Sequence, residues 1–342
     1  MKIVRAEKAA LELATLDLLT HSLVGLHLAR LPSAAGVPAG VRLLLCLAAA
    51  NAPDLDRSLL LPLRESLLPI GPAGPLHSLI GAALLAAVLV ALAWPLVAPR
   101  HRRTLAFPIT AGVGLHLLGD ALSVVRLPLF WPLSPQRFGL AWFAEADPWL
   151  WVLLAAPLVR DAFADRRAEG RLHLPWRRSK VVPLVALYLS VCAASKVRAL
   201  QATWAHHRGD ARIEEVQAYP AGPGPFRWTT LARTDDQLWH RGVFSVIGGF
   251  TPAGSFPTGD ADPRMRIALE TVTGADFRRS ARAPFLARAT GVGEDGSFEV
   301  ALGDLRFSDP RSDRLPWVLW MRIGPDFTPT EWAIVATPHG AP

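Results

Sequence analysis

Long apolar runs constrain the fold of this chain more than any other feature of its sequence. Residues 76–98 (LHSLIGAALLAAVLVALAWPLVA) contain no Asp, Glu, Lys or Arg, and residues 105–125 contain only one of these, Asp120. A helix of about 20 apolar residues can cross the roughly 30 Å hydrocarbon core of a bilayer. Both runs are therefore predicted to be transmembrane helices, and a hydrophobic content of 51% agrees with a membrane protein.

Shorter apolar segments extend this pattern to about six membrane segments. They cover residues 16–31, 37–52, 147–159 and 181–195. Beyond them, short alternating stretches such as FRWTTLAR and FEVALGDLRF lie between Gly, Pro and Asp clusters, which is typical of β-strands. A helix is expected near residues 276–290, interrupted by Pro284. We therefore expect an α-helical transmembrane domain over residues 1–200 and a soluble β-rich (α+β) domain over residues 201–342.

The net charge of +7 is unevenly distributed along the chain. Residues 1–200 hold 21 Lys and Arg against 12 Asp and Glu, whereas residues 201–342 hold 15 against 17. The slightly acidic second part argues against nucleic-acid binding. The positive charge gathers in loops near residues 100–103 and 160–180, which the positive-inside rule places in the cytoplasm. We therefore expect a multi-pass protein of the bacterial inner (plasma) membrane with an extracytoplasmic C-terminal domain.

Histidine and aspartate recur at the ends of the first four segments. The pentapeptide HSLVG at residues 21–25 returns as HSLIG at residues 77–81, and each copy lies near the start of a segment. NAPDLDR closes the second segment, and GLHLLGD lies toward the end of the fourth. Because successive helices run in opposite directions, all these positions fall on one side of the membrane. The candidate metal ligands at this level are Asp17, His21, Asp54, Asp56, His77, His116 and Asp120.

The spacing and chemistry of these residues suit a divalent metal. His116 and Asp120 are four residues apart and share one helix face, as do Asp17 and His21. A carboxylate inside an apolar membrane segment costs about 2.5 to 3.5 kcal/mol, so Asp120 must be paired or coordinated. Imidazole and carboxylate without cysteine favour zinc, manganese or iron. Two or three ions could be bridged by the aspartates of the DLD motif, and we expect one to three ions in total.

Two other classes of function also fit these residues. A transporter or proton-coupled carrier would place Asp and His inside apolar helices, although such a pathway distributes polar groups through the membrane depth. A non-catalytic envelope protein would use the same residues for packing, which is the role we expect for His27. The tryptophans of the second domain are expected in its core rather than on a sugar-binding surface.

Several motifs together resemble a known family. LDLLTHSLVG, NAPDLDR, GPLHSLIG and GLHLLGDALS, followed by LFWPLSPQRFGLAW, are similar in order to the YdjM-type family of bacterial inner-membrane proteins inferred to be metal-dependent hydrolases. The C-terminal β-rich domain resembles a longer subgroup of that family. The order of the ligands is also similar to the zinc site of zinc-dependent phospholipases C and single-strand nucleases. The resemblance implies metal ligands at His21, Asp54, His77, His116 and Asp120, with Asp17 and Asp56 as second-metal ligands or a water-activating base.

The resemblance implies a hydrolase that uses metal-activated water, with zinc as the first choice of metal. We expect a lipid-borne or small-molecule ester as substrate, a phosphoester first, and the lipid bilayer as partner. Asp56 or Asp147 is the predicted general base, since Asp147 begins the fifth segment on the same side. The family motif HRGxTHS reads PAGPLHS here, which keeps His77 but lacks a basic residue to hold an anion. The predicted substitutes are Arg57, Arg126 and Arg137. No feature of the sequence predicts an oligomeric state.

Overall fold

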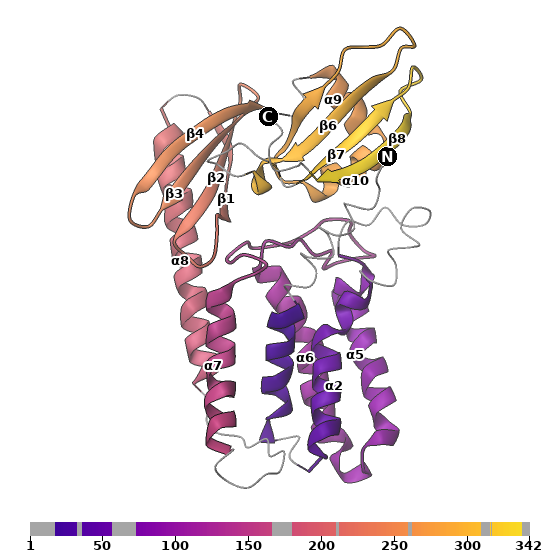
Figure 1. Cartoon of the computed structure of the whole chain (residues 1–342), viewed down its shortest axis with the longest axis vertical. Coiled ribbons are helices and arrows are strands. Elements are labelled where there is room, and N and C mark those ends of the chain that lie inside the picture. The colour runs from indigo at the N-terminus through magenta and orange to yellow at the C-terminus, as the bar shows by residue number, and fades with distance from the viewer. Residues whose placement is uncertain are drawn as a thin grey trace. The chain divides into compact units, whose positions relative to one another are not determined.

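The computed structural model describes residues 18–32, 36–56, 73–165, 180–209, 212–258, 262–308, 315 and 317–336. The described residues divide into two compact units that meet between Val191 and Cys192 along the chain. We call them the helical unit and the C-terminal unit (Figure 1). The last helix of the helical unit continues to His207, beyond the expected boundary at residue 200.

The described part of the helical unit contains apolar helices, some of which have short 3-10 turns at their ends. Each of the six segments expected from the sequence contains a helix. These are Leu18–Ala29, α2 (Ala39–Asn51), α5 (Leu79–Ala93), α6 (Arg102–Leu122), α7 (Pro148–Asp165) and α8 (Val181–His207). The turns that flank them are η2 (Ala52–Asp54), η4 (Pro75–His77), η5 (Trp94–Leu96) and η6 (Pro99–His101).

Three helical stretches in the described part of the chain are long and apolar enough to cross a membrane. They are Leu79–Leu96, Pro99–Leu122 and Val181–His207. The first two correspond to the two longest apolar runs of the sequence. Helix α2 has 13 residues and reaches only about 20 Å, which is less than the hydrocarbon thickness. The predicted count of about six membrane spans is therefore not confirmed.

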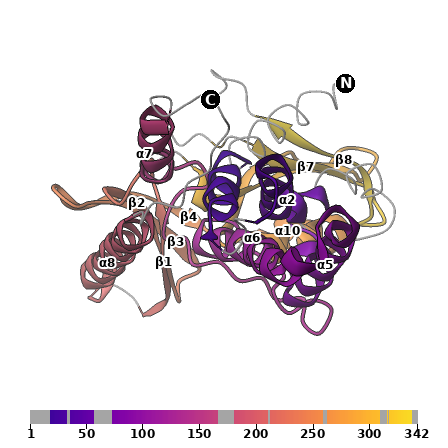
Figure 2. The ribbon, with the colours of Figure 1, turned by 90° about the horizontal axis from the view of Figure 1, so that it is seen from below.

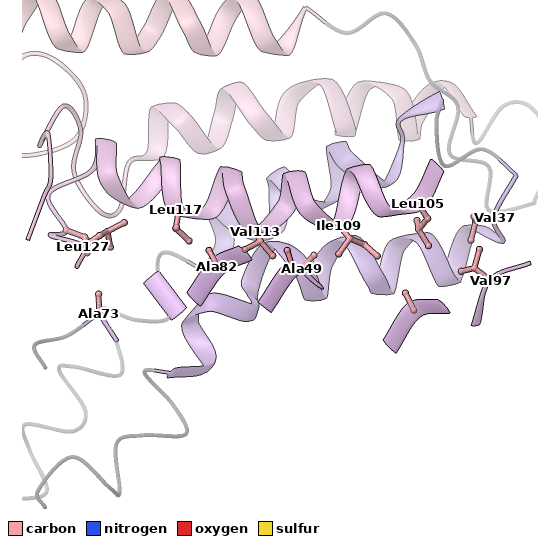
Figure 3. Packing of buried hydrophobic residues seen from close by; sticks show 13 residues of the cluster. Val37, Ala49, Ala73, Ala82, Val97, Leu105, Ile109, Val113, Leu117 and Leu127 are labelled. Atoms are coloured by element: carbon pink, nitrogen blue, oxygen red, sulfur yellow. The ribbon is translucent and has the colours of Figure 1, made fainter. Parts of the chain in front are cut away.

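A stripe of apolar residues on α6 forms the centre of the helical unit. Leu105, Ile109, Val113 and Leu117 recur at four-residue spacing and are all buried, because residues four apart lie on one helix face. They pack against small residues of α2 and α5, including Ala49 and Ala82 (Figure 3). Small residues at these contacts let the helix backbones approach closely.

The helix Leu18–Ala29 packs on the other side of the unit against α7 and the start of α8, and Figure 2 looks along these helices. Leu23, Leu154 and Val181 are buried in this contact. At its end, the Arg30 guanidinium donates a 2.8 Å hydrogen bond to Asp161 of α7, and both side chains are buried. This ion pair joins two segments that are far apart in sequence.

The C-terminal unit contains two four-stranded antiparallel sheets. Each follows its strands in sequence order, β1-β2-β3-β4 and β5-β6-β7-β8. The strands are β1 (Ile213–Pro220), β2 (Arg227–Thr234), β3 (Leu238–Ser245), β4 (Gly249–Pro257), β5 (Pro284–Ala289), β6 (Phe298–Asp304), β7 (Trp317–Ile323) and β8 (Pro329–Ala336). The predicted β-rich domain is thus confirmed as a two-sheet domain.

Helices cover part of each sheet. Residues of α8 such as Ala199 pack with Trp228 and Phe244 of the first sheet. Two short helices, α9 (Pro263–Glu270) and α10 (Val272–Ser280), lie between β4 and β5 in the chain and pack on the second sheet. The expected helix over residues 276–290 is wrong in its second half, because Pro284 opens strand β5.

Trp228 and Trp239 are buried, whereas Trp332 is exposed. The expectation that tryptophans fill the core therefore holds only for some of them.

Candidate metal centre

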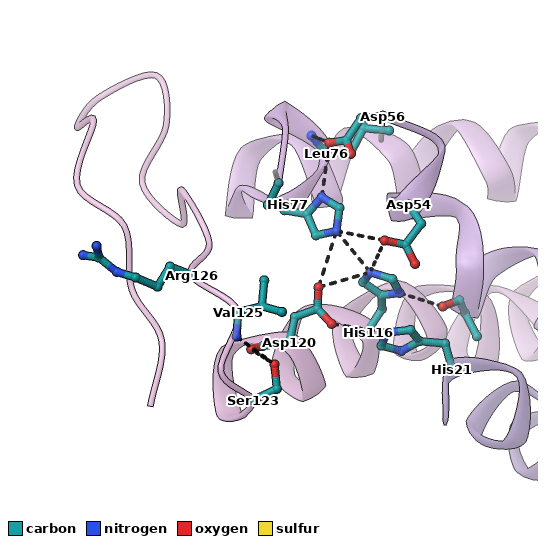
Figure 4. Close-up of polar contacts among 12 residues, drawn as sticks. His21, Asp54, Asp56, Leu76, His77, His116, Asp120, Ser123, Val125 and Arg126 are labelled. Atoms are coloured by element: carbon teal, nitrogen blue, oxygen red, sulfur yellow. Dashed lines mark hydrogen bonds and ion pairs between the residues drawn. The ribbon is translucent and has the colours of Figure 1, made fainter. Parts of the chain in front are cut away.

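Four parts of the helical unit bring histidine and aspartate side chains together (Figure 4). His21 comes from the first described helix, Asp54 from η2, His77 from η4, and His116 and Asp120 from α6. The Asp54 side chain is 19% exposed, and the other four residues are buried. Five of the seven predicted ligands therefore come together in one cluster.

The local sequence explains how η4 presents His77. Ser78 caps α5, because its hydroxyl accepts from the Gly81 amide at 2.9 Å and donates to the Pro75 carbonyl at 2.7 Å. A Cβ at Gly81 would lie 2.1 Å from that carbonyl oxygen. The motif HSLIG therefore needs both Ser and Gly to place His77 at the end of the turn.

The first copy of the motif uses its glycine differently. His21 and Gly25 lie inside one continuous helix. A Cβ at Gly25 would lie 2.9 Å from the Cys46 carbonyl oxygen of α2, so the glycine allows this helix to approach α2. The two pentapeptides are similar in sequence but form different local structures, and both deliver a histidine to the same cluster.

Two carboxylate oxygens lie near the same pair of imidazole nitrogens within the cluster. Nε2 of His77 lies 3.3 Å from Nε2 of His116. From His77 Nε2, Asp54 Oδ1 and Asp120 Oδ2 are each 3.5 Å away. From His116 Nε2, the same two oxygens are 3.8 and 3.7 Å away. Ligands at the usual zinc distances of about 2.0 to 2.1 Å are about 3.3 Å apart in a tetrahedron, so these separations are close to those of a metal site.

Hydrogen bonds at the far side of each ring fix the direction of the histidine lone pairs. His116 Nδ1 lies 2.8 Å from the Ala50 carbonyl oxygen, which only accepts, so Nδ1 carries the proton. His77 Nδ1 lies 3.2 Å from Asp56 Oδ2, and a carboxylate likewise accepts. In the neutral rings both Nε2 atoms therefore present lone pairs to each other and to Asp54 and Asp120. A cation near the two Nε2 atoms would accept both lone pairs.

Both carboxylate oxygens of Asp120 face other residues of the cluster. Oδ1 lies 3.2 Å from His21 Nε2, whereas Oδ2 is buried and has no hydrogen-bond partner among the described residues. The orphaned oxygen is the one that faces His77 and His116, which fits a coordinating role. The His21 ring also stacks on the His116 ring with centroids 3.8 Å apart. Asp54, His77 and His116 form one group able to hold a metal, and His21, His116 and Asp120 form another.

Asp56 lies behind His77 rather than beside the converging atoms. Its Oδ2 accepts from the Leu76 amide at 3.0 Å as well as from His77 Nδ1. A Cβ at Gly74 would lie 2.6 Å from the same oxygen, so glycine at this position of PAGPLHS leaves room for the carboxylate. Asp56 is therefore placed to orient His77, in the way that carboxylates support metal-binding histidines.

The contacts of Asp147 lie elsewhere in the helical unit. Its Oδ1 accepts from the Trp149 and Leu150 amides at the start of α7, and its Oδ2 accepts from the Tyr188 hydroxyl. These contacts explain its burial as a helix cap. The role of Asp56 or Asp147 as general base is not tested by these contacts and stays a prediction.

The remaining predicted residues are placed as follows. Asp17 and Arg57 lie outside the described residues. Arg126 is directed away from the cluster in Figure 4 and donates to the Arg137 carbonyl. Arg137 is buried, and its guanidinium donates to the Ala73 and Arg126 carbonyls.

Sequence reasoning missed two groups that shape the centre. The Ala50 carbonyl sets the proton position on His116, but a backbone group leaves no signal in the sequence. Asn51 donates to the Ser22 hydroxyl and the Leu47 carbonyl, which ties α2 to the residue after His21. Asn51 begins the NAPDLDR motif, and this position in the sequence could have identified it as a residue of the centre.

Comparisons with known proteins bear on the helical unit. No curated protein and no solved structure matches the chain. The family profile described as YdjM inner membrane protein matches residues 16–200, a stretch that includes every residue of the cluster. This match covers more than half of the chain, so the protein belongs to the YdjM inner membrane protein family.

Proposed function

We propose that this protein is a membrane-bound metal-dependent hydrolase whose divalent cation is held by Asp54, His77, His116 and Asp120. The observation that carries the proposal is that two imidazole nitrogens lie 3.3 Å apart and that two carboxylate oxygens each lie 3.5 to 3.8 Å from both nitrogens. The donor set contains nitrogen and oxygen but no sulfur, which suits zinc first and also manganese or iron.

The residues of the chain prepare the site in distinct ways. Asp56 and the Ala50 carbonyl hold the protons on His77 and His116 at Nδ1, which leaves each Nε2 free to coordinate. When bound, a divalent cation supplies a Lewis acid that polarises a phosphoryl or carbonyl oxygen and makes water a nucleophile near neutral pH. Asp54 is the only ligand with appreciable exposure, so water and substrate reach the centre on its side.

The site also accommodates a second ion in this proposal. Asp120 presents Oδ2 to His77 and His116 and Oδ1 to His21, so it would serve as a ligand in both groups if two cations were bound. His21, together with Asp17 as inferred from the family motif, supplies the further ligands. The total is then one to three ions per chain.

The substrate in this proposal is a lipid-borne or small-molecule ester, with a phosphoester as the first choice. Three of the four ligands lie near the end of α6 or beside the start of α5, which are both candidate membrane spans, and Asp54 lies on η2 after α2. Arg100 and Arg102 lie at the opposite end of Pro99–Leu122. The positive-inside rule then puts the basic end in the cytoplasm and the metal centre on the extracytoplasmic side, with the C-terminal unit also on that side.

A comparison of metal content and hydrolysis tests the proposal. The protein is purified in detergent without a metal-binding tag, and metal per chain is measured by elemental mass spectrometry for the native chain, His116→Ala and His27→Ala. His27 is a matched control, because it is a partly buried histidine of the same unit that contacts the Leu154 carbonyl instead of the cluster.

We expect one to three ions in the native chain and in His27→Ala, and their loss in His116→Ala. Hydrolysis of mono- and diester nitrophenyl phosphates and of a lipid phosphate in mixed micelles should fall with the metal. A native chain without metal, or His116→Ala protein with full activity, contradicts the proposal. Far-ultraviolet circular dichroism and gel filtration establish that both variants are folded.

One observation favours a proton-coupled carrier as a second candidate function. The first described helix and the residue after it carry polar contacts at successive positions. His21 contacts Asp120, His27 contacts the Leu154 carbonyl, and Arg30 pairs with Asp161. A carrier predicts pH-gradient-dependent uptake into proteoliposomes that is lost in both His21→Ala and His27→Ala, whereas the hydrolase predicts no effect of His27→Ala.

A further inference from the structure

The segment between α6 and α7 forms a closed apolar hairpin. Leu127 and Phe138 exchange two backbone hydrogen bonds of 2.8 Å each. Between and including them the sequence reads LPLFWPLSPQRF, which has one Arg and no Lys, Asp or Glu. We call residues 127–138 the apolar hairpin. An ordered surface segment of this composition is unusual in contact with water.

The apolar hairpin directs large hydrophobic side chains outward. Leu133 is 83% exposed, and Phe130 and Phe138 are also exposed. The two phenylalanine rings contact each other edge to face, with centroids 5.1 Å apart. The inner residues Leu127 and Leu129 pack against the core cluster of α5 and α6. The hairpin is therefore fixed to the helical unit on one side, while its other side presents apolar surface.

This apolar surface adjoins the outer face of a candidate membrane span. The Leu79 amide at the start of α5 donates a 2.9 Å hydrogen bond to the Leu129 carbonyl. From that point the exposed residues of α5 recur at four-residue spacing. They are Ile80, Leu84, Val88 and Leu92. An uncharged span turns its exposed apolar side chains toward lipid. The apolar hairpin therefore adjoins the end of the lipid-facing stripe of α5.

Two arginines lie at the base of the apolar hairpin. The Arg126 guanidinium donates to the Arg137 carbonyl at 2.7 Å, and the Arg137 guanidinium donates to the Arg126 carbonyl at 3.2 Å. Arg137 also donates to the Ala73 carbonyl. Exposed apolar side chains therefore occupy the tip of the hairpin, whereas Arg126 and the buried Arg137 occupy its base.

The same contacts join the apolar hairpin to the metal centre. Ala73 and Leu79, which both bond to the hairpin or its base, lie on either side of His77 in the chain. The segment that presents His77 is therefore held between two attachments to the hairpin. The position of the hairpin relative to the membrane therefore also sets the depth of His77.

We propose that the apolar hairpin inserts into the bilayer interface on the side of the His and Asp cluster, with Leu133 and Phe130 at the level of the upper acyl chains and Arg126 and Arg137 at the level of the headgroups. The partner of this surface is the lipid bilayer itself. The proposal goes beyond the hydrolase and holds with or without metal, since it rests on the exposed apolar surface and its continuity with α5.

Depth-dependent fluorescence quenching tests the insertion in the full chain. A cysteine is placed at Leu133, labelled with an environment-sensitive nitrobenzoxadiazole dye, and the protein is reconstituted into phosphatidylcholine vesicles. The native Cys46 and Cys192 are both buried and are replaced by alanine. Val88→Cys is the control for lipid contact, and Asp295→Cys on the exposed β5–β6 connection is the control for water contact.

The label at position 133 is expected to lose fluorescence with lipids brominated near the headgroup, and to lose less with lipids brominated near the chain end. The label at position 88 should show the reverse order, and the label at position 295 should respond only to aqueous iodide. If the label at 133 behaves like that at 295, or is shielded from both bromine and iodide by a second copy or by another part of the chain, the proposal is overturned. Leu133 is so exposed that its replacement leaves the fold intact.

Discussion

The Asp56 carboxylate accepts a hydrogen bond from His77 Nδ1 at 3.2 Å, on the side of the ring opposite to the converging ligand atoms. The same oxygen accepts from the Leu76 amide, so its position is fixed by the backbone of the turn that carries His77. The charge of Asp56 therefore acts on the cluster through the imidazole. This arrangement makes Nε2 of His77 a stronger electron-pair donor to a metal, and it fixes the orientation of the ring.

We predict that Asp56→Asn weakens metal binding without removing it. The asparagine oxygen can still accept from His77, but the loss of charge lowers the basicity of the ring, and metal affinity should fall about 10- to 100-fold. Competition with a fluorescent chelator measures the affinity. Asp147→Asn is the matched control, since its contacts are at the start of α7, and its affinity should be native. Equal affinities in both variants would show that Asp56 has no supporting role.

A second prediction concerns the contact between α2 and α6. Gly112 lies one turn before His116, and a Cβ there would be 3.1 Å from the Ala49 Cβ and 3.2 Å from the Ala50 amide nitrogen. Gly112→Leu should push the helices apart, lower the free energy of unfolding by about 1 to 3 kcal/mol, and draw the Ala50 carbonyl away from His116 Nδ1. Metal affinity should fall together with stability.

Gly114 provides the control for this variant. It lies on the same helix, and a Cβ there meets nothing within 4 Å. Gly114→Leu should retain native metal affinity and stability in detergent unfolding experiments. Native metal affinity in Gly112→Leu would show that the carbonyl of α2 is not needed to orient His116.

A third prediction tests the C-terminal unit. Asp304 is fully buried and accepts four hydrogen bonds, from the amides of Arg282, Ala283 and Arg306 and from the Arg306 guanidinium. Asp304→Ala removes the carboxylate that neutralises the Arg306 guanidinium and accepts from three amides, which should cost about 3 to 5 kcal/mol. Thermal unfolding of the full chain, followed by tryptophan fluorescence, measures the loss. As a control, the exposed Asp295→Ala variant should unfold at the same temperature as the native chain. If Asp304→Ala also unfolds at the native temperature, the Asp304 carboxylate does not stabilise the C-terminal unit.

Much of the fold could be predicted because apolar runs and alternating stretches report directly on local structure. The six apolar segments all contain helices, but their length alone could not tell which of them cross a membrane, as the 13 residues of α2 illustrate. In the C-terminal unit, alternation indicated strands around Trp228 and Val300. Their assignment to two separate sheets depends on pairing between distant residues, which leaves no local pattern.

The candidate site was predictable to a similar degree. The four-residue spacing of His116 and Asp120 placed both on one face of α6, where both are now seen to face His77. The spacing of the DLD motif did not separate Asp54, which faces the cluster, from Asp56, which lies behind His77. That difference arises from the η2 turn and from the close approach of Gly74, and neither can be read from residue types alone.

The last prediction concerns the buried ion pair of Arg30 and Asp161, whose 2.8 Å hydrogen bond joins the first described helix to α7. Asp161→Asn leaves the Arg30 charge buried without its counter-charge and should lower the free energy of unfolding by about 3 to 5 kcal/mol. The double variant Arg30→Met, Asp161→Leu removes both charges and should recover most of this loss, because two apolar side chains of similar size replace the pair. Unfolding in mixed detergent micelles measures both effects.

Metal content should stay native in the double variant, since the pair does not touch the cluster. A double variant as unstable as Asp161→Asn would show that the pair contributes more than charge balance, and that it holds the helix carrying His21 in place.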